Sequence, residues 1–310
     1  LAGTEVPCGL KPAPQALKNP LGHHTRDQNR GRQWGRAILE VMGWSRFRLR
    51  WLAVAAVLGA LGGLSYLYAQ RGQGVFTIEG EYVPPPPDAE EETEFVFARL
   101  AYRSEYGARW GPGAWMIDAP KAERHFLQGV KRLTTIHARS MEHFLRATDA
   151  DLFDYPWLYV VEPGQWSLSD EEAALLREYL LRGGTMITDD FHGTIEWTFF
   201  LRGLRKIFPD RPVVEIDGKD AVFHTLYDID ERFQVPGVQM LFTGRPYEQD
   251  GVEAHWRGVY DDQGRLMVII NFNMDLGDAW EHADMPEYPE KMTALAYRFG
   301  INYIVYAMTH

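Results

Sequence analysis

Cysteine is almost missing from the sequence. Among 310 residues the only thiol belongs to Cys8. Residues 9–310 can therefore form no disulfide, no cysteine-ligated zinc site and no cysteine nucleophile. Proteins of every compartment include chains without disulfides, so the scarcity of cysteine excludes mechanisms but leaves the location open.

Three common functional motifs are also missing. The sequence has no G-x-S-x-G nucleophile elbow, no G-x-x-x-x-G-K-[ST] phosphate loop and no H-E-x-x-H zinc helix. The chemistry of serine hydrolases, P-loop nucleotide hydrolases and zinc proteases depends on those arrangements. The sequence therefore contains no complete catalytic signature.

Positive charge is scarce beyond the N-terminal part of the chain. Residues 1–75 contain ten Lys and Arg against three acids, a net charge of +7, which leaves −18 for the rest of a chain whose total is −11. Such an acidic surface repels phosphate backbones, so we expect no nucleic-acid partner. Acidity also favours solubility, which explains the composition without any functional role.

One long hydrophobic run is present, at residues 51–69, and it has no charged side chain. At about 1.5 Å per residue, a helix of this length spans roughly 28 Å, close to the thickness of the bilayer core. Arg46, Arg48 and Arg50 precede the run, which predicts a cytoplasmic N-terminus. In this interpretation the run is a helical anchor in the inner membrane, and the domain lies in the periplasm or outside the cell.

The same residues fit a cleaved signal peptide. A start at Met42 would make residues 42–50 a basic n-region and residues 51–64 an apolar h-region. Cleavage near Ala69 would then secrete the domain, although Leu67 is a poor residue at the −3 position. Residues 1–50 are interpreted as a disordered basic tail, of which 1–41 would be translated upstream sequence if Met42 is the start.

A linker is predicted between this run and the folded domain. Residues 70–93 include four prolines at 84–87, followed by an acidic stretch at 88–92. Consecutive prolines favour an extended chain, and the acids keep it solvated. The folded domain is therefore predicted at residues 94–310.

Strand and helix patterns alternate within residues 94–310. Strands are predicted at 95–100, 157–161, 185–188, 213–216, 255–260 and 266–271. Helices are predicted at 122–133, 173–181, 195–207 and 289–306, the second after a capping box formed by Ser169 and Glu172. The alternation indicates an α/β fold whose mainly parallel sheet has helices on both faces. Ligands of such sheets bind beyond the carboxyl ends of the strands.

Short segments spread in order along the domain carry a family resemblance. They are Phe97-Ala98-Arg99-Leu100, Asp154-Tyr155-Pro156, Glu162-Pro163-Gly164, Leu180-Leu181-Arg182-Gly183-Gly184, Asp189-Asp190-Phe191, Phe208-Pro209-Asp210-Arg211-Pro212, Asn273 to Trp280 and Gly300 to His310. With them, residues 94–310 resemble the domain-of-unknown-function family numbered 4159. The resemblance implies a flavodoxin-like sheet, similar to class I glutamine amidotransferases, and no established activity.

The resemblance also implies a bacterial exported or membrane-attached protein, in a family sometimes associated with MoxR-type ATPases and von Willebrand factor domains. Amidotransferases of this fold present a cysteine on a nucleophile elbow. Because residues 94–310 contain no cysteine, we expect no Cys-dependent amidotransferase activity.

Acidic side chains follow two neighbouring strand patterns. Asp189, Asp190 and His192 follow the strand at 185–188, and Glu162 follows the strand at 157–161. At one edge of a sheet these candidate catalytic groups would share a crevice, and Asp189, Asp190 and His192 are candidate metal ligands. The alternative is structural: Asp189 caps the next helix, His192 is merely exposed, and Glu162 accepts backbone N–H groups in its turn.

Further candidate ligand-binding residues lie after the strand at 266–271 and at the end of the first strand. They are Asn273, Asp275, Asp278 and Trp280 in the first group, and Arg99 and Tyr102 in the second. An oxygen-rich run can hold calcium or bond to itself, and Arg99 can bind an anion or pair with an acid. Trp110 and Trp115 form either a sugar-stacking platform or a cover for the core, and His224 is interpreted as structural.

Two functions remain open. The first is an envelope binding module whose crevice takes a partner protein or a polar small molecule such as a saccharide. The second is a metal-assisted or acid/base hydrolase that uses Asp189, Asp190 and His192. The missing nucleophile favours binding; no cofactor is predicted, with a divalent metal as the one possible exception.

Overall fold

A computed structural model describes residues 74–77, 80–104 and 113–310. All of them belong to one structural unit, Leu67–His310. The predicted tail at 1–50, the hydrophobic run at 51–69 and Trp110 lie outside the described residues. Within the described part of the chain, no helix is long and apolar enough to cross a bilayer.

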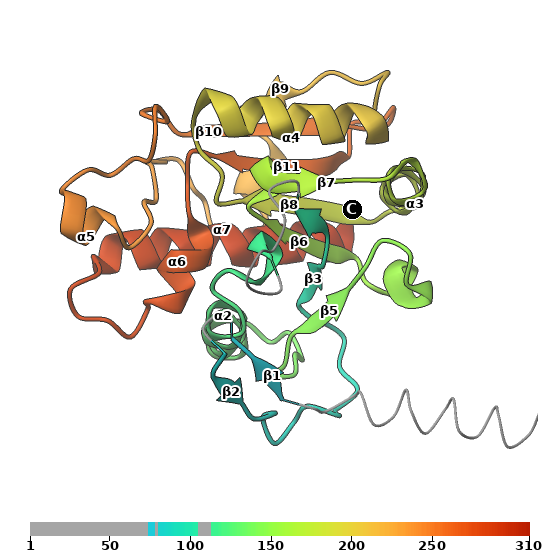
Figure 1. Ribbon diagram of the computed structural model, residues 1–310. Coiled ribbons are helices and arrows are strands. Elements are labelled where there is room, and N and C mark those ends of the chain that lie inside the picture. The colour runs from blue at the N-terminus through green and yellow to red at the C-terminus, as the bar shows by residue number, and fades with distance from the viewer. Residues whose placement is uncertain (1–73, 78–79, 105–112) are drawn as a thin grey trace, which may run out of the picture. The chain divides into compact units, whose positions relative to one another are not determined.

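A seven-stranded sheet forms the centre of the domain (Figure 1). Its strands are β3 (Ala98–Leu100), β5 (His143–Leu145), β6 (Trp157–Val161), β8 (Thr185–Asp189), β9 (Val214–Glu215), β10 (His255–Tyr260) and β11 (Leu266–Phe272). Five of them run parallel in the order β5-β3-β6-β8-β11, and β10 and β9 extend one edge antiparallel. The predicted α/β fold with a mainly parallel sheet is confirmed.

Helices cover both faces of the sheet (Figure 1). One face packs against α2 (Lys121–Leu133), α6 (Leu276–Glu281) and α7 (Glu290–Thr309), and the other against α3 (Asp170–Leu181) and α4 (Gly193–Ile207). The short helix α5 (Met240–Thr243) lies in the long connection between β9 and β10. Single 3₁₀ turns are η1 (Ala114–Met116), η2 (Ala150–Asp154), η3 (Pro163–Gln165) and η4 (Ala221–Phe223).

The central strands divide their side chains between two hydrophobic cores. In β6, Trp157, Tyr159 and Val161 enter the core beneath α2 and α7, while Leu158 and Val160 enter the core beneath α3 and α4. This division follows from the two-residue period of a strand. Because both faces are covered, β6 reads as a continuous apolar run, the pattern from which it was predicted.

The predicted elements agree with the structure except near the first strand. The prediction of a strand at 95–100 is wrong for residues 95–97, because Phe95 makes only an isolated bridge to Ala138 and β3 begins at Ala98. The strand β5 was not predicted, since its three residues are too few to show a period. Two short pairs lie outside the main sheet: β1 (Val75–Phe76) with β2 (Tyr82–Val83), in the predicted linker, and β4 (Arg103–Ser104) with β7 (Trp166–Ser167).

The predicted capping box at the start of α3 is confirmed. The Ser169 hydroxyl accepts the Glu172 N–H at 3.1 Å, and the Ser169 N–H donates to the Glu172 carboxylate at 2.8 Å. We expect Ser169→Ala to lower the free energy of unfolding by about 1 kcal/mol and the melting temperature by about 3 °C. Thermal unfolding checks this, with Ser169→Asp as the control that keeps a capping oxygen. An equal loss in both variants would show that the cap does not stabilise the helix.

Candidate functional site

The carboxyl ends of three parallel strands share one unusual backbone conformation. Glu162, Asp190 and Asn273 each follow a strand directly, and their φ angles are 46°, 54° and 63°. Only two other non-glycine residues in the described ranges have a positive φ, Asp118 at 63° and Gln249 at 49°. Left-handed backbone is costly for residues with a side chain and concentrates at functional sites.

Hydrogen bonds hold these strained turns in place. The Tyr102 hydroxyl donates to the carbonyl oxygens of Val161 and Glu162, both at 2.8 Å. The Asn273 amide oxygen accepts the Gly193 N–H at 2.9 Å, and its amide nitrogen donates to the Glu253 carbonyl oxygen, just before β10, at 2.6 Å. Tyr102 and Asn273, which were predicted to bind ligand, are thus engaged in shaping the crevice.

The two adjacent carboxylates at the end of β8, Asp189 and Asp190, have different surroundings. Asp189 is fully buried, and its Oδ2 accepts the N–H groups of Leu276 and Gly277 at 2.7 and 3.1 Å and the Tyr159 hydroxyl at 3.0 Å. Asp189 therefore caps α6, and not the helix that follows it in sequence. Burial raises its pKa to about 7, although these hydrogen bonds favour the charged form.

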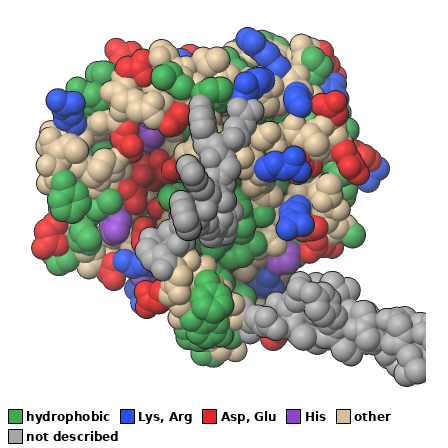
Figure 2. All heavy atoms as spheres, viewed as in Figure 1, with side chains coloured by type: hydrophobic (Ala, Val, Ile, Leu, Met, Phe, Trp, Pro, Cys, Tyr) green, Lys and Arg blue, Asp and Glu red, His purple; other side chains and the backbone are tan. Residues whose placement is uncertain are grey.

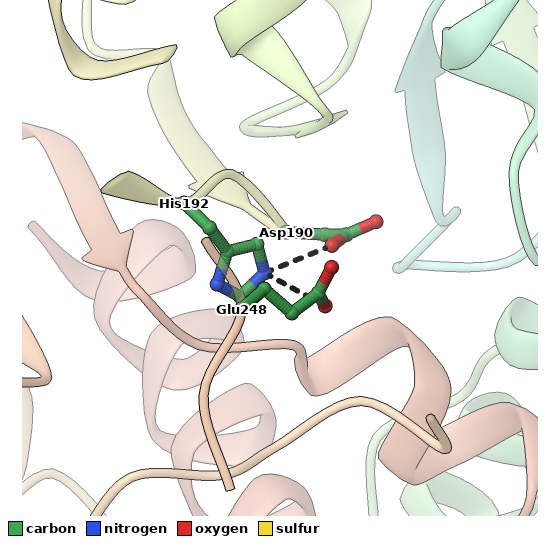
Figure 3. Close-up of side chains that lie close together, drawn as sticks. All are labelled: Asp190, His192 and Glu248. Carbon is green, nitrogen blue, oxygen red and sulfur yellow. Dashed lines mark hydrogen bonds and ion pairs between the residues drawn. The ribbon is translucent and has the colours of Figure 1, made fainter. Parts of the chain in front are cut away.

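Asp190, His192 and Glu248 converge on one point (Figure 3). The His192 Nε2 lies 3.2 Å from an Asp190 carboxylate oxygen and 3.4 Å from a Glu248 carboxylate oxygen. All three potential ligand atoms lie within 4.8 Å of one another. Asp190 and His192 are only 8% and 4% exposed, and Glu248 is half-buried. The structure thus brings together two of the three predicted metal ligands and adds Glu248, which was not predicted.

Burial shifts the ionisation of every group in this cluster. It lowers the pKa of His192 to about 4, so the ring is neutral near pH 7. Burial also raises the pKa of Asp190 well above its usual range, and the neighbouring Glu162 raises it further. The pKa of Glu162 rises to about 8 and that of Glu248 to about 7, in both cases through burial and then through the charge of Glu196. These carboxyl groups hold protons near neutral pH unless a cation compensates them.

The donor set suits a divalent metal ion. One imidazole nitrogen and two carboxylate oxygens are ligands that Zn²⁺ and Mn²⁺ accept. The neutral ring of His192 carries one proton, and its buried Nδ1 has no hydrogen-bond partner in the described part of the chain. Since Nε2 faces two carboxyl groups, it holds that proton in the metal-free chain, and a bound cation would take the Nε2 lone pair while the proton moves to Nδ1.

A second group of acids lies in the same region. Asp118, Asp275 and Asp278 place carboxylate oxygens within 4.8 Å of one another, and Asp278 also approaches Glu281 and His282. Figure 2 shows acidic side chains gathered in a recessed part of this face, with histidines nearby. These acids have structural partners, however, because Asp275 caps α6 by accepting the Asp278 N–H at 2.7 Å, and Asp278 accepts the Val238 N–H from the β9–β10 connection at 2.6 Å.

Arg99 and Trp280 lie away from the crevice surface. The Arg99 side chain is fully buried, forms an ion pair with Glu123 and donates to the carbonyl oxygen of Trp115 at 3.0 Å. The Trp280 ring is also buried and packs on Phe126, with 4.4 Å between the ring centroids. Both side chains thus stabilise the core and the η1 loop and are not placed to contact a ligand.

Two other aromatic or imidazole candidates have structural contacts. Trp115 packs edge-on against Phe144, with ring centroids 5.5 Å apart. His224 contacts an Asp228 carboxylate oxygen at 3.0 Å and the Gly218 carbonyl oxygen at 2.9 Å. These contacts agree with a covering role for Trp115 and a structural role for His224.

Comparison with known proteins identifies the family. A family model described as "Domain of unknown function (DUF4159)" matches residues 96–308. A search of curated proteins finds no match. The matched region contains all seven strands of the main sheet and the cluster of Asp190, His192 and Glu248. The chain therefore belongs to the DUF4159 family.

Proposed function

We propose that the domain binds a divalent metal ion between Asp190, His192 and Glu248 and uses it to hold a polar ligand in the crevice. The convergence of their three ligand atoms within 4.8 Å carries the proposal. Asp190 and His192 are almost fully buried, and a buried charge without a partner is costly. Three protein ligands leave coordination positions open, so the oxygen atoms of a small polar molecule, such as a saccharide, can complete the shell.

Metal titration of the full chain tests this proposal. In metal-free buffer, Mn²⁺ or Zn²⁺ at about 100 times its dissociation constant is expected to stabilise the fold by about 2.7 kcal/mol, which raises the melting temperature by about 5–10 °C. His192→Ala should abolish the increase. His137→Ala is the matched control, because His137 is an exposed histidine that pairs with Glu91 outside the cluster. No stabilisation of the wild type, or equal stabilisation of His192→Ala, would count against a metal site here.

Glu162 favours a second candidate function, metal-assisted hydrolysis. Its carboxyl group has a pKa of about 8 and follows β6 at the same sheet edge as Asp190. A carboxyl group that exchanges its proton near neutral pH is suited to general acid or base catalysis, which contributes about 10²–10⁴-fold to a rate. The test substrates are p-nitrophenyl phosphate and p-nitrophenyl acetate. Their hydrolysis by the Mn²⁺-loaded chain, with loss of that activity in Glu162→Gln, would support this function. If the metal-loaded wild type hydrolyses neither substrate, the hydrolase function is contradicted and the binding function is retained.

The strand order supports a flavodoxin-like fold. In order of sequence, the parallel strands lie as second, first, third, fourth and fifth across the sheet. This is the flavodoxin-like order, in which ligands bind where the order reverses. The reversal lies between β3 and β6, so Tyr102 and Glu162 follow the two strands that flank it. We therefore propose that the domain has the fold of class I glutamine amidotransferases but not their cysteine-dependent chemistry.

We also propose that residues 51–69 place the domain outside the cytoplasm, as a retained membrane anchor or as a cleaved signal peptide. The charge-free run behind Arg46, Arg48 and Arg50 supports the export of the domain. Cell fractionation combined with N-terminal sequencing separates the outcomes. A mature chain beginning at Gln70 indicates cleavage, and an intact chain in the membrane fraction indicates an anchor. An intact chain found only in the cytosol would contradict export.

A further inference from the structure

A groove of about 620 Å³ lies between α2 and α7, lined by residues separate from the acidic crevice. The two helices contribute His125, Gln128, Arg132, Thr293, Tyr297 and Arg298 to its polar lining, and loops add Tyr227 and Asp284. Gly129 shapes the wall, because a Cβ atom at this position would overlap the Tyr297 ring. The volume lies in the range of small-molecule sites, roughly 300–1,000 Å³.

The charge of the groove is opposite to that of the domain around it. Arg132 and Arg298 line it, and neither has an acidic partner among the described residues. Asp284 is the only acid among the described lining residues, and it pairs with Lys121 at 3.5 Å on the surface, so the two arginines outnumber it. Two uncompensated guanidinium groups therefore face one groove in a region of the sequence that is strongly acidic.

The remaining polar groups supply directional hydrogen bonds. The His125 Nδ1 lies 3.1 Å from the Trp280 carbonyl oxygen, and since a carbonyl only accepts, Nδ1 carries the proton. The Nε2 of the neutral ring is then an acceptor, so His125 lines the groove without donating to an anion. Burial raises the pKa of Tyr297 to about 12, so its hydroxyl remains a donor at neutral pH. Gln128 and Thr293 add amide and hydroxyl groups to the same lining.

We propose that the α2–α7 groove binds a small organic anion through a carboxylate or phosphate group. A guanidinium group presents paired N–H donors that match both oxyanions. Arg132 and Arg298 provide the charge, and the Tyr297 hydroxyl provides a further donor. The proposal does not depend on the metal site, because the groove shares no lining residue with Asp190, His192 and Glu248.

Calorimetric titration of the full chain tests the groove. Inorganic phosphate and succinate are the probes, in metal-free buffer so that a bound cation cannot capture them, and with chloride holding ionic strength constant. We expect saturable binding of at least one probe and a loss of about tenfold or more in the double variant R132Q/R298Q. The preferred probe distinguishes a phosphate from a carboxylate ligand.

A matched double variant controls for net charge. R205Q/R245Q removes two other exposed arginines that do not line the groove, and its affinity is expected to stay within about twofold of the wild type. Circular dichroism of all variants confirms that they fold. No saturable binding of either probe by the wild type, or an equal loss in both double variants, would overturn the proposal.

Discussion

Asp189→Ala is expected to lower the free energy of unfolding by about 3–5 kcal/mol, whereas Asp190→Asn is expected to leave it unchanged or raise it. Asp189 accepts three hydrogen bonds in the core, two of them from the first N–H groups of α6. Removing its carboxylate leaves those buried donors without partners. Asp190 instead faces other carboxyl groups and holds its proton near neutral pH, so a neutral amide of the same shape can replace it at little cost.

Chemical unfolding of the two variants, combined with metal titration, measures this contrast. Asp190→Asn should keep a folded domain while losing metal affinity by about 100-fold or more. Asp189→Ala should melt about 10 °C lower, since a domain of this size loses about 2–4 °C per kcal/mol. If Asp190→Asn destabilises the fold as much as Asp189→Ala does, the two carboxylates are both structural and the assignment of Asp190 to a site is wrong.

The metal-free chain is expected to lose stability as the pH rises from about 6.5 to 8, with a fall of about 10 °C in melting temperature. Glu162 and Glu248 have folded-state pKa values of about 8 and 7, above their ordinary value of 4.5. When folding raises the pKa of a carboxyl group, the folded chain holds the proton at pH values where the unfolded chain has released it. The fold therefore loses stability as the pH rises from the unfolded-state pKa to the folded-state pKa. Asp189, with a pKa of about 7, adds a loss of the same sign.

A bound cation should offset this loss, because it compensates the ionised carboxylates. Metal affinity should then increase with pH by up to about tenfold per unit for each proton displaced, until the carboxyl groups are fully ionised. His192 adds no pH dependence to metal affinity above about pH 5, since its pKa of about 4 leaves the folded ring neutral. Its lowered pKa does stabilise the fold as the pH rises from about 4 to 6.5, because only the unfolded chain binds the proton in that range. Melting curves from pH 4 to 8, with and without Mn²⁺, give both quantities. A metal-free chain that is more stable at pH 8 than at pH 6.5 would contradict the ionisation described for the crevice.

Glu162→Gln provides the internal control for the pH series. The substitution removes one titrating group and keeps a side chain of the same shape, so the fall in stability should become smaller. Glu171→Gln is the matched comparison, because Glu171 is exposed in the first turn of α3. An unchanged pH profile in Glu162→Gln would show that this carboxyl does not ionise in the range assigned to it.

The fold was predictable where local patterns are strong. Strands β6 and β10 match their predicted bounds, because long apolar or alternating runs define them. The capping box marks the start of α3 in the same local way. The strand β5 was missed because a three-residue edge strand contributes no period and depends on pairing with β3.

The site was only partly predictable, for two physical reasons. Asp190 leaves the strand in left-handed backbone with a φ of 54°, so the strand period could not show that its side chain diverges from that of Asp189. Glu248 comes from the long connection between β9 and β10, where no repeat or local motif links it to His192. Only the folded chain brings its carboxylate to 3.4 Å from the His192 ring.

The most direct measurement is anomalous X-ray diffraction from crystals of the chain loaded with Zn²⁺. A peak is expected about 2.0–2.2 Å from the His192 Nε2 and from one carboxylate oxygen each of Asp190 and Glu248. The same crystals report on the competing group of Asp278, Glu281 and His282. A peak at that second group alone, or no peak in the crevice at saturating Zn²⁺, would contradict a metal site at Asp190, His192 and Glu248.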